Sequence, residues 1–156
     1  MPNNLYGPND NFDLETSHVL PALIRKFHEA KLNGSKKVEI WGTGKPKREF
    51  LHVDDLADAC VFLMKKINSN QLYHKGISHI NVGSGEEVTI EELALMIKDI
   101  VGYQGDLRFN KSYPDGMLRK LLDVSRLSKI GWRAKINLNR GLLETYDWFN
   151  LNVVIS

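Results

Sequence analysis

Cysteine is almost missing from this sequence: Cys60 is the one cysteine among 156 residues. A single thiol cannot form a disulfide within the chain, and such sparse cysteine is typical of the reducing cytoplasm. Long apolar runs are also missing, which excludes a transmembrane helix. The start Met1-Pro2-Asn3-Asn4 lacks the basic cluster and the apolar core of a signal peptide. We therefore expect a cytoplasmic protein without a membrane partner.

An excess of charge of one sign is missing as well. The 21 basic and 19 acidic residues leave a net charge of +2, too small to favour nucleic acid as a partner. No spacing of cysteine and histidine resembles a metal site. Recognition of an anion must therefore depend on local clusters of cations. With 42% hydrophobic residues the chain can bury a modest core, and we predict a single domain over residues 1–156.

Short extended runs alternate with helical patterns along the chain. Residues 1–16, rich in Asn, Asp, Gly and Pro, are typical of an irregular loop. Helices are predicted to follow the caps Ser17, Asp54–Asp55, Thr89 and Asn137, with a short helix from about Ser125 and strands at 38–41, 49–53, 79–82 and 107–109. Thr89 and Glu92 match a capping box. This alternation predicts a small mixed α/β domain.

Two glycine turns resemble phosphate-binding loops without matching them. The run Gly42-Thr43-Gly44-Lys45-Pro46 lacks the first glycine of the Walker pattern and has a proline after its lysine. The run Gly83-Ser84-Gly85 lacks the third glycine of a dinucleotide-binding turn. We interpret both as tight turns at strand ends. Cys60 lies on the apolar stripe of its predicted helix, and we interpret it as a core residue and not a nucleophile.

Two clusters of polar residues suit a phosphorylated ligand. The first contains Trp41 and, after it, Lys45, Lys47 and Arg48. An aromatic face beside cations suits the base or sugar and the phosphates of a nucleotide. The second contains Asp115, Arg119 and Lys120. It falls in a predicted loop, where binding residues are common although most charged side chains are only solvated.

His18 stands at the start of the first predicted helix, in the run Ser17-His18-Val19-Leu20-Pro21. Ser17 is a common type of N-cap, and a proline is tolerated in a first turn because the early N–H groups have no helical partner. Neither residue accounts for His18. It is either a solvent-facing residue of the first turn or a group that transfers a proton, since an ordinary imidazole titrates near neutral pH.

Three segments together resemble the C-terminal half of the extended short-chain dehydrogenase/reductases that act on nucleotide sugars: 4–8, 48–55 and 81–85, which read NLYGP, REFLHVDD and NVGSG. Within that group, the runs 17–30, 38–55 and 114–123 resemble the GDP-L-fucose synthase family. The resemblance extends over essentially the whole chain. It implies the substrate-binding part of that fold.

That family converts GDP-4-keto-6-deoxy-D-mannose to GDP-L-fucose, epimerising C3 and C5 before NADPH reduces C4. The resemblance implies that His18 is the acid of epimerisation and lies beside the nicotinamide. It also implies that Asn4 and Leu5, in the loop 1–16, line the NADP(H) site. The implied contacts to the GDP-sugar come from Lys26, Trp41, Arg48, Asp115 and Lys120. Lys26 stands where some relatives have arginine, so the charge is retained without its bidentate geometry.

The family's Rossmann half is what this sequence lacks. It contains neither a G-x-x-G-x-x-G turn nor a Tyr-x-x-x-Lys motif, and Cys60 does not match the family's catalytic cysteine, the base that partners the histidine. The resemblance implies that the missing half binds most of the cofactor and that full-length relatives are homodimers. We expect the chain alone not to be a competent reductase. We also expect it to expose the apolar faces that would meet that half.

Three functions remain open on the sequence. The first is part of an NADP-dependent epimerase/reductase, either a truncated product or one half of a split enzyme that pairs with a separate Rossmann half. The second is a non-catalytic nucleotide-sugar-binding module, or a fragment of another nucleotide-sugar epimerase or dehydratase. The third is an interaction domain.

Overall fold

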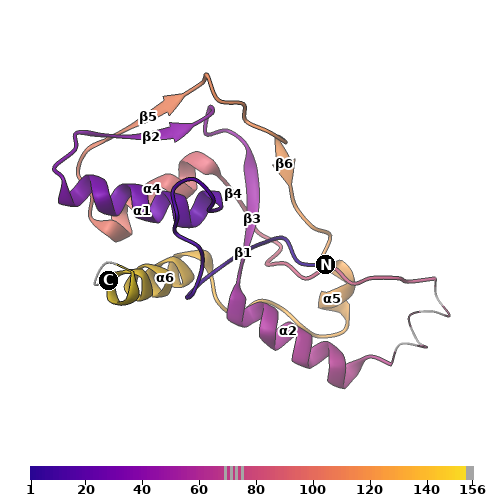
Figure 1. Cartoon of the computed structure of the whole chain (residues 1–156). Coiled ribbons are helices and arrows are strands. Elements are labelled where there is room, and N and C mark those ends of the chain that lie inside the picture. The colour runs from indigo at the N-terminus through magenta and orange to yellow at the C-terminus, as the bar shows by residue number, and fades with distance from the viewer. Residues whose placement is uncertain (69, 71, 73, 75, 154–156) are drawn as a thin grey trace.

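Figure 1 shows the chain as a computed structural model that describes residues 1–68, 70, 72, 74 and 76–153. The strands are β1 (Asn4–Tyr6), β2 (Lys37–Trp41), β3 (Lys47–His52), β4 (Glu87–Thr89), β5 (Asp106–Asn110) and β6 (Arg119–Lys120). The helices are α1 (Val19–Leu32), α2 (Val53–Lys66), α4 (Ile90–Val101), α5 (Ser125–Lys129) and α6 (Leu138–Asn152). The predicted mixed α/β class is confirmed. Among the helices described, none has the length and hydropathy needed to cross a membrane.

The strand β3 is the centre of the larger sheet. It pairs in parallel with β1 and β6 and antiparallel with β4. The strands β2 and β5 form a separate parallel pair, with α1 and α4 lying beneath it in Figure 1. β3 runs between this region and α2, so it connects the two ends of the molecule (Figure 1).

Two hydrophobic cores meet at β3. The first packs α1, β2, α4 and α6 together through buried residues that include Leu20, Ile24, Phe27, Val38, Ile40, Leu93, Ile97, Leu142 and Phe149. The second joins α2 and α5 to the start of the chain through Leu51, Ala59, Ile80, Val82, Leu127 and Trp132. Successive side chains of a strand point to opposite faces, so Phe50 enters the first core and Leu51 the second.

Several predicted helix starts are corrected by the structure. The N-cap of α1 is His18, which makes no capping side-chain bond, and not Ser17. The N-cap of α2 is His52, whose Nδ1 accepts from the Asp54 amide, so Asp54 and Asp55 lie in the first turn. Both cap residues have an extended backbone. Sequence alone predicts the position of a cap only to within a residue or two. The capping box at Thr89 and the cap at Asn137 are confirmed.

The short strands differ most from the sequence predictions. Residues 1–16 are not one irregular loop, because β1 forms within them. The strand predicted at 79–82 is reduced to a single parallel bridge between Pro2 and Val82. β4 and β6 were not predicted. Runs of two or three residues carry too little periodicity to be recognised, and their ladders form with β3, which is distant in sequence.

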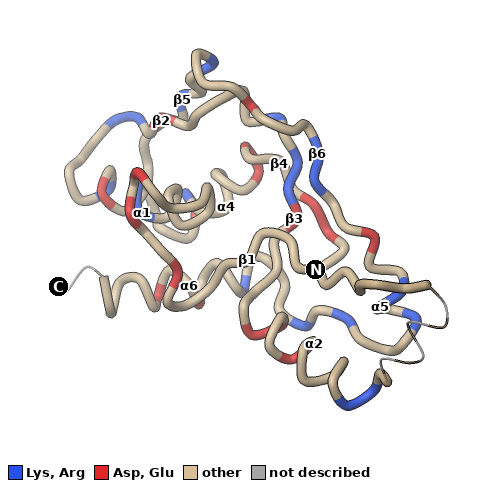
Figure 2. Tube along the Cα trace, turned by 45° about the vertical axis from the view of Figure 1, so that its right-hand side comes forward, with Lys and Arg blue, Asp and Glu red and all other residues tan. Residues whose placement is uncertain are grey.

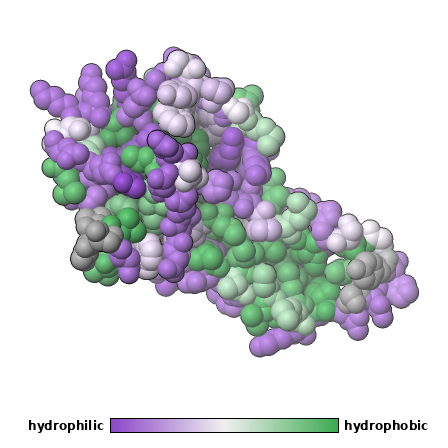
Figure 3. Space-filling view, viewed as in Figure 1, coloured by the Kyte–Doolittle hydropathy of each residue, from purple (hydrophilic) through white to green (hydrophobic). Residues whose placement is uncertain are grey.

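Cys60 is exposed, which corrects its interpretation as a core residue. The buried face of α2 contains fewer apolar residues than the predicted stripe. Ala59 is the apolar residue of α2 that is fully buried. The outer face carries a second apolar row: Val53, Ala57, Cys60, Val61 and Met64. In Figure 3 a hydrophobic area covers the region of α2. α2 therefore exposes an apolar face, and its contact with a Rossmann half stays a prediction.

Glu49 on β3 is completely buried and holds three other segments to the strand. Its Oε2 accepts hydrogen bonds from the Asn3 side chain at 2.9 Å and from the Leu122 amide at 3.1 Å. Its Oε1 accepts from the Gly85 amide at 2.7 Å. A Cβ at Gly83 would collide with the same carboxyl group, so this turn can approach only as glycine. A buried polar group requires such partners, because an unpaired one is costly.

We expect Glu49→Gln to lower the free energy of unfolding by about 1–3 kcal/mol, because one carboxyl oxygen becomes an N–H₂ group facing donors. Urea unfolding monitored by circular dichroism measures the change. Glu15→Gln is the control, at an exposed position in the loop before α1. It should change the free energy by less than about 0.5 kcal/mol. Equal midpoints for the two variants contradict the role given to Glu49.

His28 is a buried polar residue of α1 in the first core. Its Nδ1 lies 3.1 Å from the hydroxyl of Tyr146, and its ring packs edge-on against Phe149. Its Nε2 is buried without a partner. Burial holds the pKa of His28 below its ordinary value of 6.5, and the nearby Lys31 charge lowers it further. The core therefore favours the neutral ring.

Stability should fall as the pH drops below about 6.5, the ordinary pKa of histidine. The unfolded chain then takes up a proton at position 28 that the folded chain resists, so unfolding becomes easier. His28→Phe removes this proton uptake, and the pH dependence of the unfolding midpoint should become flatter. The exposed His74, replaced by asparagine, is the control and should leave the slope unchanged. A wild-type slope in His28→Phe contradicts the prediction.

Candidate functional site

A row of cations lies where β3 and β6 pair. The parallel register sets Lys47 beside Arg119 and Arg48 beside Lys120, and Figure 2 shows the basic residues of the two strands side by side. Glu87 of β4 binds the first pair, with its carboxyl oxygens 3.5 Å from Lys47 Nζ and 2.8 Å from Arg119 Nε. Alternation along the strands places the second pair on the opposite face.

Arg48 and Lys120, the two cations predicted to hold the GDP-sugar, are thus separated from this acidic partner. Among the residues that the structure describes, neither has a salt bridge to a carboxylate. Lys120 is exposed and Arg48 is half-buried, with its Nη1 donating to the Lys47 carbonyl. Two adjacent cations without a counter-charge suit an incoming anion such as a diphosphate.

Trp41 and Lys26 come together at the end of β2. The ammonium of Lys26, on α1, lies 4.7 Å from the centre of the Trp41 ring and 3.4 Å from the Glu39 carbonyl. Partial burial lowers the pKa of Lys26, and the Glu39 charge opposes that effect. The indole is 53% exposed. Lys26 therefore makes a cation–π contact with Trp41, and its side chain does not simply extend into solvent.

Asp115 closes the turn that follows Trp41. Its Oδ1 accepts from the Thr43 amide at 2.6 Å and its Oδ2 from the Thr43 hydroxyl at 2.7 Å. These bonds, the hydroxyl bond first, lower the pKa of Asp115. Gly42 has φ +81°, and a Cβ there would collide with Asp115 Oδ1. We call Thr43 and Asp115 the loop clamp.

The loop clamp links the aromatic and basic parts of the site. The position of a Cβ on Gly116, next to Asp115, lies 3.9 Å from Arg48 Nη2. The five residues predicted to hold the GDP-sugar thus come as two neighbouring pairs, Lys26 with Trp41 and Arg48 with Lys120, and as Asp115 in the loop whose Gly116 approaches Arg48. We call this set the polar strip. It is built from α1, β2, β3, β6 and the 111–118 loop.

The residues predicted to line the cofactor are Asn4 and Leu5 in β1 and His18 at the start of α1. Asn4 donates to the Glu49 carbonyl at 2.7 Å, and Leu5 packs against the second core. His18 is exposed at the start of α1, and eight residues of helix separate it from Lys26, about 12 Å along the axis. The structure therefore places His18 apart from the polar strip.

Asp10 is a neighbour of His18 that the sequence did not single out. Its Oδ2 is buried, and no residue that the structure describes forms a hydrogen bond with it. Burial raises its pKa, while the Asn11 amide and the charge of His18 oppose that effect. Asp10 also lines a cavity of about 180 Å³ together with Leu5, Gly7 and Val53. Of the residues predicted to line the cofactor, Leu5 thus borders this hollow and His18 lies near the Asp10 carboxyl group.

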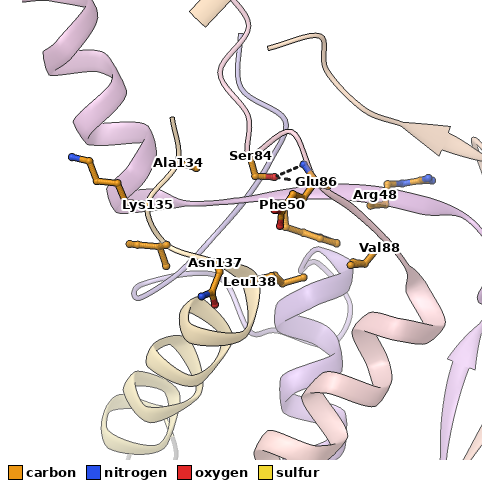
Figure 4. Close-up of a pocket in the computed structure, with 10 residues that line it drawn as sticks. Arg48, Phe50, Ser84, Glu86, Val88, Ala134, Lys135, Asn137 and Leu138 are labelled. Atoms are coloured by element: carbon orange, nitrogen blue, oxygen red, sulfur yellow. Dashed lines mark hydrogen bonds between the residues drawn. The ribbon is translucent and has the colours of Figure 1, made fainter. Parts of the chain in front are cut away.

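A second cavity, of about 150 Å³, lies between β3, β4 and the start of α6. Phe50, Val88 and Leu138 line its apolar side (Figure 4). Arg48 is its one residue from the polar strip, and Figure 4 shows the guanidinium extending away from the other lining residues. This cavity is therefore not the predicted substrate site.

Sequence reasoning missed three residues that shape the site: Thr43, Tyr113 and Asp10. The Gly-Thr-Gly run could have drawn attention to Thr43, because a threonine hydroxyl in a tight turn commonly donates to a nearby acceptor. Tyr113 precedes the Pro114-Asp115-Gly116 run, and its ring stacks on Trp41. Asp10 lies eight residues before His18 and is polar in a loop of polar residues, so no pattern distinguished it.

The fold and these motifs place the chain in a known class. The chain belongs to the NAD dependent epimerase/dehydratase family, whose sequence model matches residues 1–83. It is 58% identical over 153 residues to GDP-L-fucose synthase 1 of Arabidopsis thaliana, covering 98% of this chain and 45% of that protein. The chain thus spans about half the length of the curated relatives that it matches.

Two solved structures have the same arrangement. A GDP-6-OMe-4-keto-L-xylo-heptose reductase from C. jejuni matches 96% of this chain and 52% of its own, with a TM-score of 0.89 and 42% identity. A GDP-L-fucose synthetase from Naegleria fowleri bound to NADP matches 99% of this chain and 47% of its own, with a TM-score of 0.86 and 29% identity. The resemblance read from the sequence is confirmed.

Loss of the loop clamp should free the turn after Trp41. In Asp115→Ala both bonds to Thr43 disappear, and we expect the Thr43 amide to exchange its hydrogen at least about tenfold faster. Asp115→Asn is the matched control, because its amide oxygen still accepts from the backbone and its N–H₂ group can donate to the hydroxyl. Hydrogen exchange observed by NMR measures both. Unchanged exchange in the alanine variant contradicts the clamp.

Proposed function

We propose that this chain is the nucleotide-sugar-binding part of an NADP-dependent epimerase/reductase that converts GDP-4-keto-6-deoxy-D-mannose to GDP-L-fucose. The observation that carries the proposal is the polar strip, in which Lys26 contacts Trp41, Arg48 lies beside Lys120, and Asp115 holds the turn that follows Trp41. The 58% identity to the Arabidopsis thaliana relative supports the substrate class. The half-length of the chain relative to that protein supports a second half that completes the activity.

The polar strip suits a GDP-sugar by its chemistry. Arg48 and Lys120, which lack a carboxylate partner in the described chain, are available to a diphosphate. Charge-assisted hydrogen bonds to phosphate are among the stronger polar contacts of proteins. The indole of Trp41 has Lys26 and Tyr113 against its ring and stays 53% exposed, so its open part can contact the base or the sugar. The loop clamp holds the turn that follows Trp41.

Epimerisation beside a ketone requires one group to remove the carbon-bound proton and another to return a proton on the opposite face. We propose that His18 returns the proton to carbon. Its position supports this role, since the imidazole is exposed at the first turn of α1, next to Asp10. The base that removes the proton belongs to the half that this chain does not contain. His18 alone therefore completes no catalytic cycle.

The residues near His18 fit one edge of a nicotinamide cofactor. The unpaired, buried Oδ2 of Asp10 can accept a hydrogen bond from an N–H donor such as a carboxamide. Leu5 and Val53 supply apolar contacts at the same hollow. When bound, NADPH supplies the hydride that reduces the C4 carbonyl. In this chain Asn4, Leu5 and His18 would border that cofactor, while most of its contacts come from the other half.

The outer face of α2 supports pairing with an N-terminal half. Its apolar row is spaced as one helical face, and the side chain of Met64 is 84% exposed and that of Val61 51%. Among the described strands, β1 pairs with β3 and ends the order of its sheet. An exposed apolar row such as that of α2 is typical of an interface.

A non-catalytic nucleotide-sugar-binding module is the second candidate. It is favoured by the separation of His18 from the polar strip. The strip is assembled entirely within this chain, whereas the catalytic cysteine that would partner His18 belongs to the other half. In that function the chain would hold the GDP-sugar without converting it.

Binding and catalysis are tested separately. Calorimetric titration with GDP-L-fucose should show binding to the chain, and Arg48→Ala or Lys120→Ala should weaken it by about tenfold or more. Lys47→Ala is the matched control: it removes a neighbouring cation on the Glu87 face and should change the affinity by less than about twofold.

For catalysis, the chain is mixed with the N-terminal half of the Arabidopsis thaliana relative, NADPH and the 4-keto substrate. Loss of NADPH absorbance supports the enzyme function, and His18→Asn should reduce the rate by about 10²–10⁴-fold without changing the affinity for GDP-L-fucose. Binding without turnover favours the second candidate. A chain that neither binds the GDP-sugar nor restores turnover contradicts both.

A further inference from the structure

Trp41 and Tyr113 form a stacked pair on the surface of the polar strip. Their ring centres are 4.5 Å apart and their planes differ by 11°. Trp41 remains 53% exposed and Tyr113 41% exposed. The two rings stack on each other and still expose much of their surface to solvent. Burial in a core therefore does not explain their contact.

The backbone turn between them is specifically arranged. Trp41 is the register partner of Asn110 at the end of β5, and the Gly42 amide donates to the Asn110 carbonyl at 2.9 Å. The Tyr113 amide donates to the same carbonyl at 3.3 Å, which folds the chain back toward β2. The Asn110 side chain fixes the turn by accepting from the amide and hydroxyl of Ser112.

The loop clamp closes the arrangement one step further along both segments. Thr43 lies two residues after Trp41, and Asp115 lies two residues after Tyr113. Their paired hydrogen bonds, with the Asn110 turn on the other side, enclose the two aromatic residues between fixed points. Lys26 contacts the indole from a third element. The orientation of the indole is therefore set before any ligand arrives.

We propose that Tyr113 is a positioning residue of the nucleotide-sugar site, which holds the Trp41 indole in the orientation that the ligand contacts. The inference rests on the proposed function, since it takes Trp41 as a ligand-binding residue. Tyr113 acts through Trp41 and not on the reacting atoms. An indole that rotates freely must lose side-chain entropy when a ligand immobilises it, and a stacked indole has already lost it.

The chain itself, labelled with ¹⁵N, provides a test that needs no ligand. The ring of Tyr113 should shift the indole N–H signal of Trp41, which is assigned with Trp41→Phe. Tyr113→Ala should move that signal, while Tyr113→Phe, which keeps the ring, should leave it near its original position. The signals of Trp132 and Trp148 report whether the fold is retained. A Trp41 signal that does not respond to Tyr113→Ala overturns the inference.

Calorimetric titration with GDP-L-fucose tests the consequence for binding. Tyr113→Ala should weaken binding by about five- to tenfold, and Tyr113→Phe by less than about twofold. Met117→Ala is the control, since Met117 is 64% exposed in the same loop. Unchanged affinity in Tyr113→Ala, with binding by the unaltered chain intact, overturns this inference alone. Absence of binding by the unaltered chain overturns the proposed function and the inference together.

Discussion

The buried carboxyl group of Glu49 is the constraint on which the arrangement of this chain depends. It satisfies donors from the N-terminal segment, from the turn at Gly85 and from the segment after β6. These segments are far apart in sequence, and the Glu49 carboxyl group is the buried acceptor that their donors share. Because Glu49 precedes Phe50 and Leu51, the same stretch of β3 also joins both hydrophobic cores. The polar strip is attached to this stretch through Arg48.

The polar strip shows how a surface site is made from a scaffold of short ladders. Parallel pairing of β3 with β6 puts two cations on each face, and Glu87 binds one pair and not the other. The difference between a paired and an available cation is thus set by strand alternation. At the other end of the strip the Thr43–Asp115 clamp fixes the aromatic pair. Strand pairing and the loop clamp thus position the cations and the aromatic rings at the surface.

The half-length of the chain gives its exposed surfaces a physical meaning. The apolar row of α2 lies at the opposite end of the molecule from β2 and β5 (Figure 1). His18 lies near Asp10, which lines the hollow together with Leu5 and Val53. In the proposed function, the residues that bind the nucleotide sugar and the residue that returns the proton come from different segments of the chain.

The sequence by itself determined the longer helices and the β2 and β5 strands, and it predicted the five residues of the polar strip as a binding site. Periodicity over many residues and a matching family pattern carry that information. Only the tertiary structure decided which helix residues act as caps, that Cys60 faces solvent, and that β1, β4 and β6 form. It also decided that Glu87 binds Lys47 but not Arg48, and that Tyr113 stacks on Trp41. These features depend on contacts between residues distant in sequence, whose energies no local pattern contains.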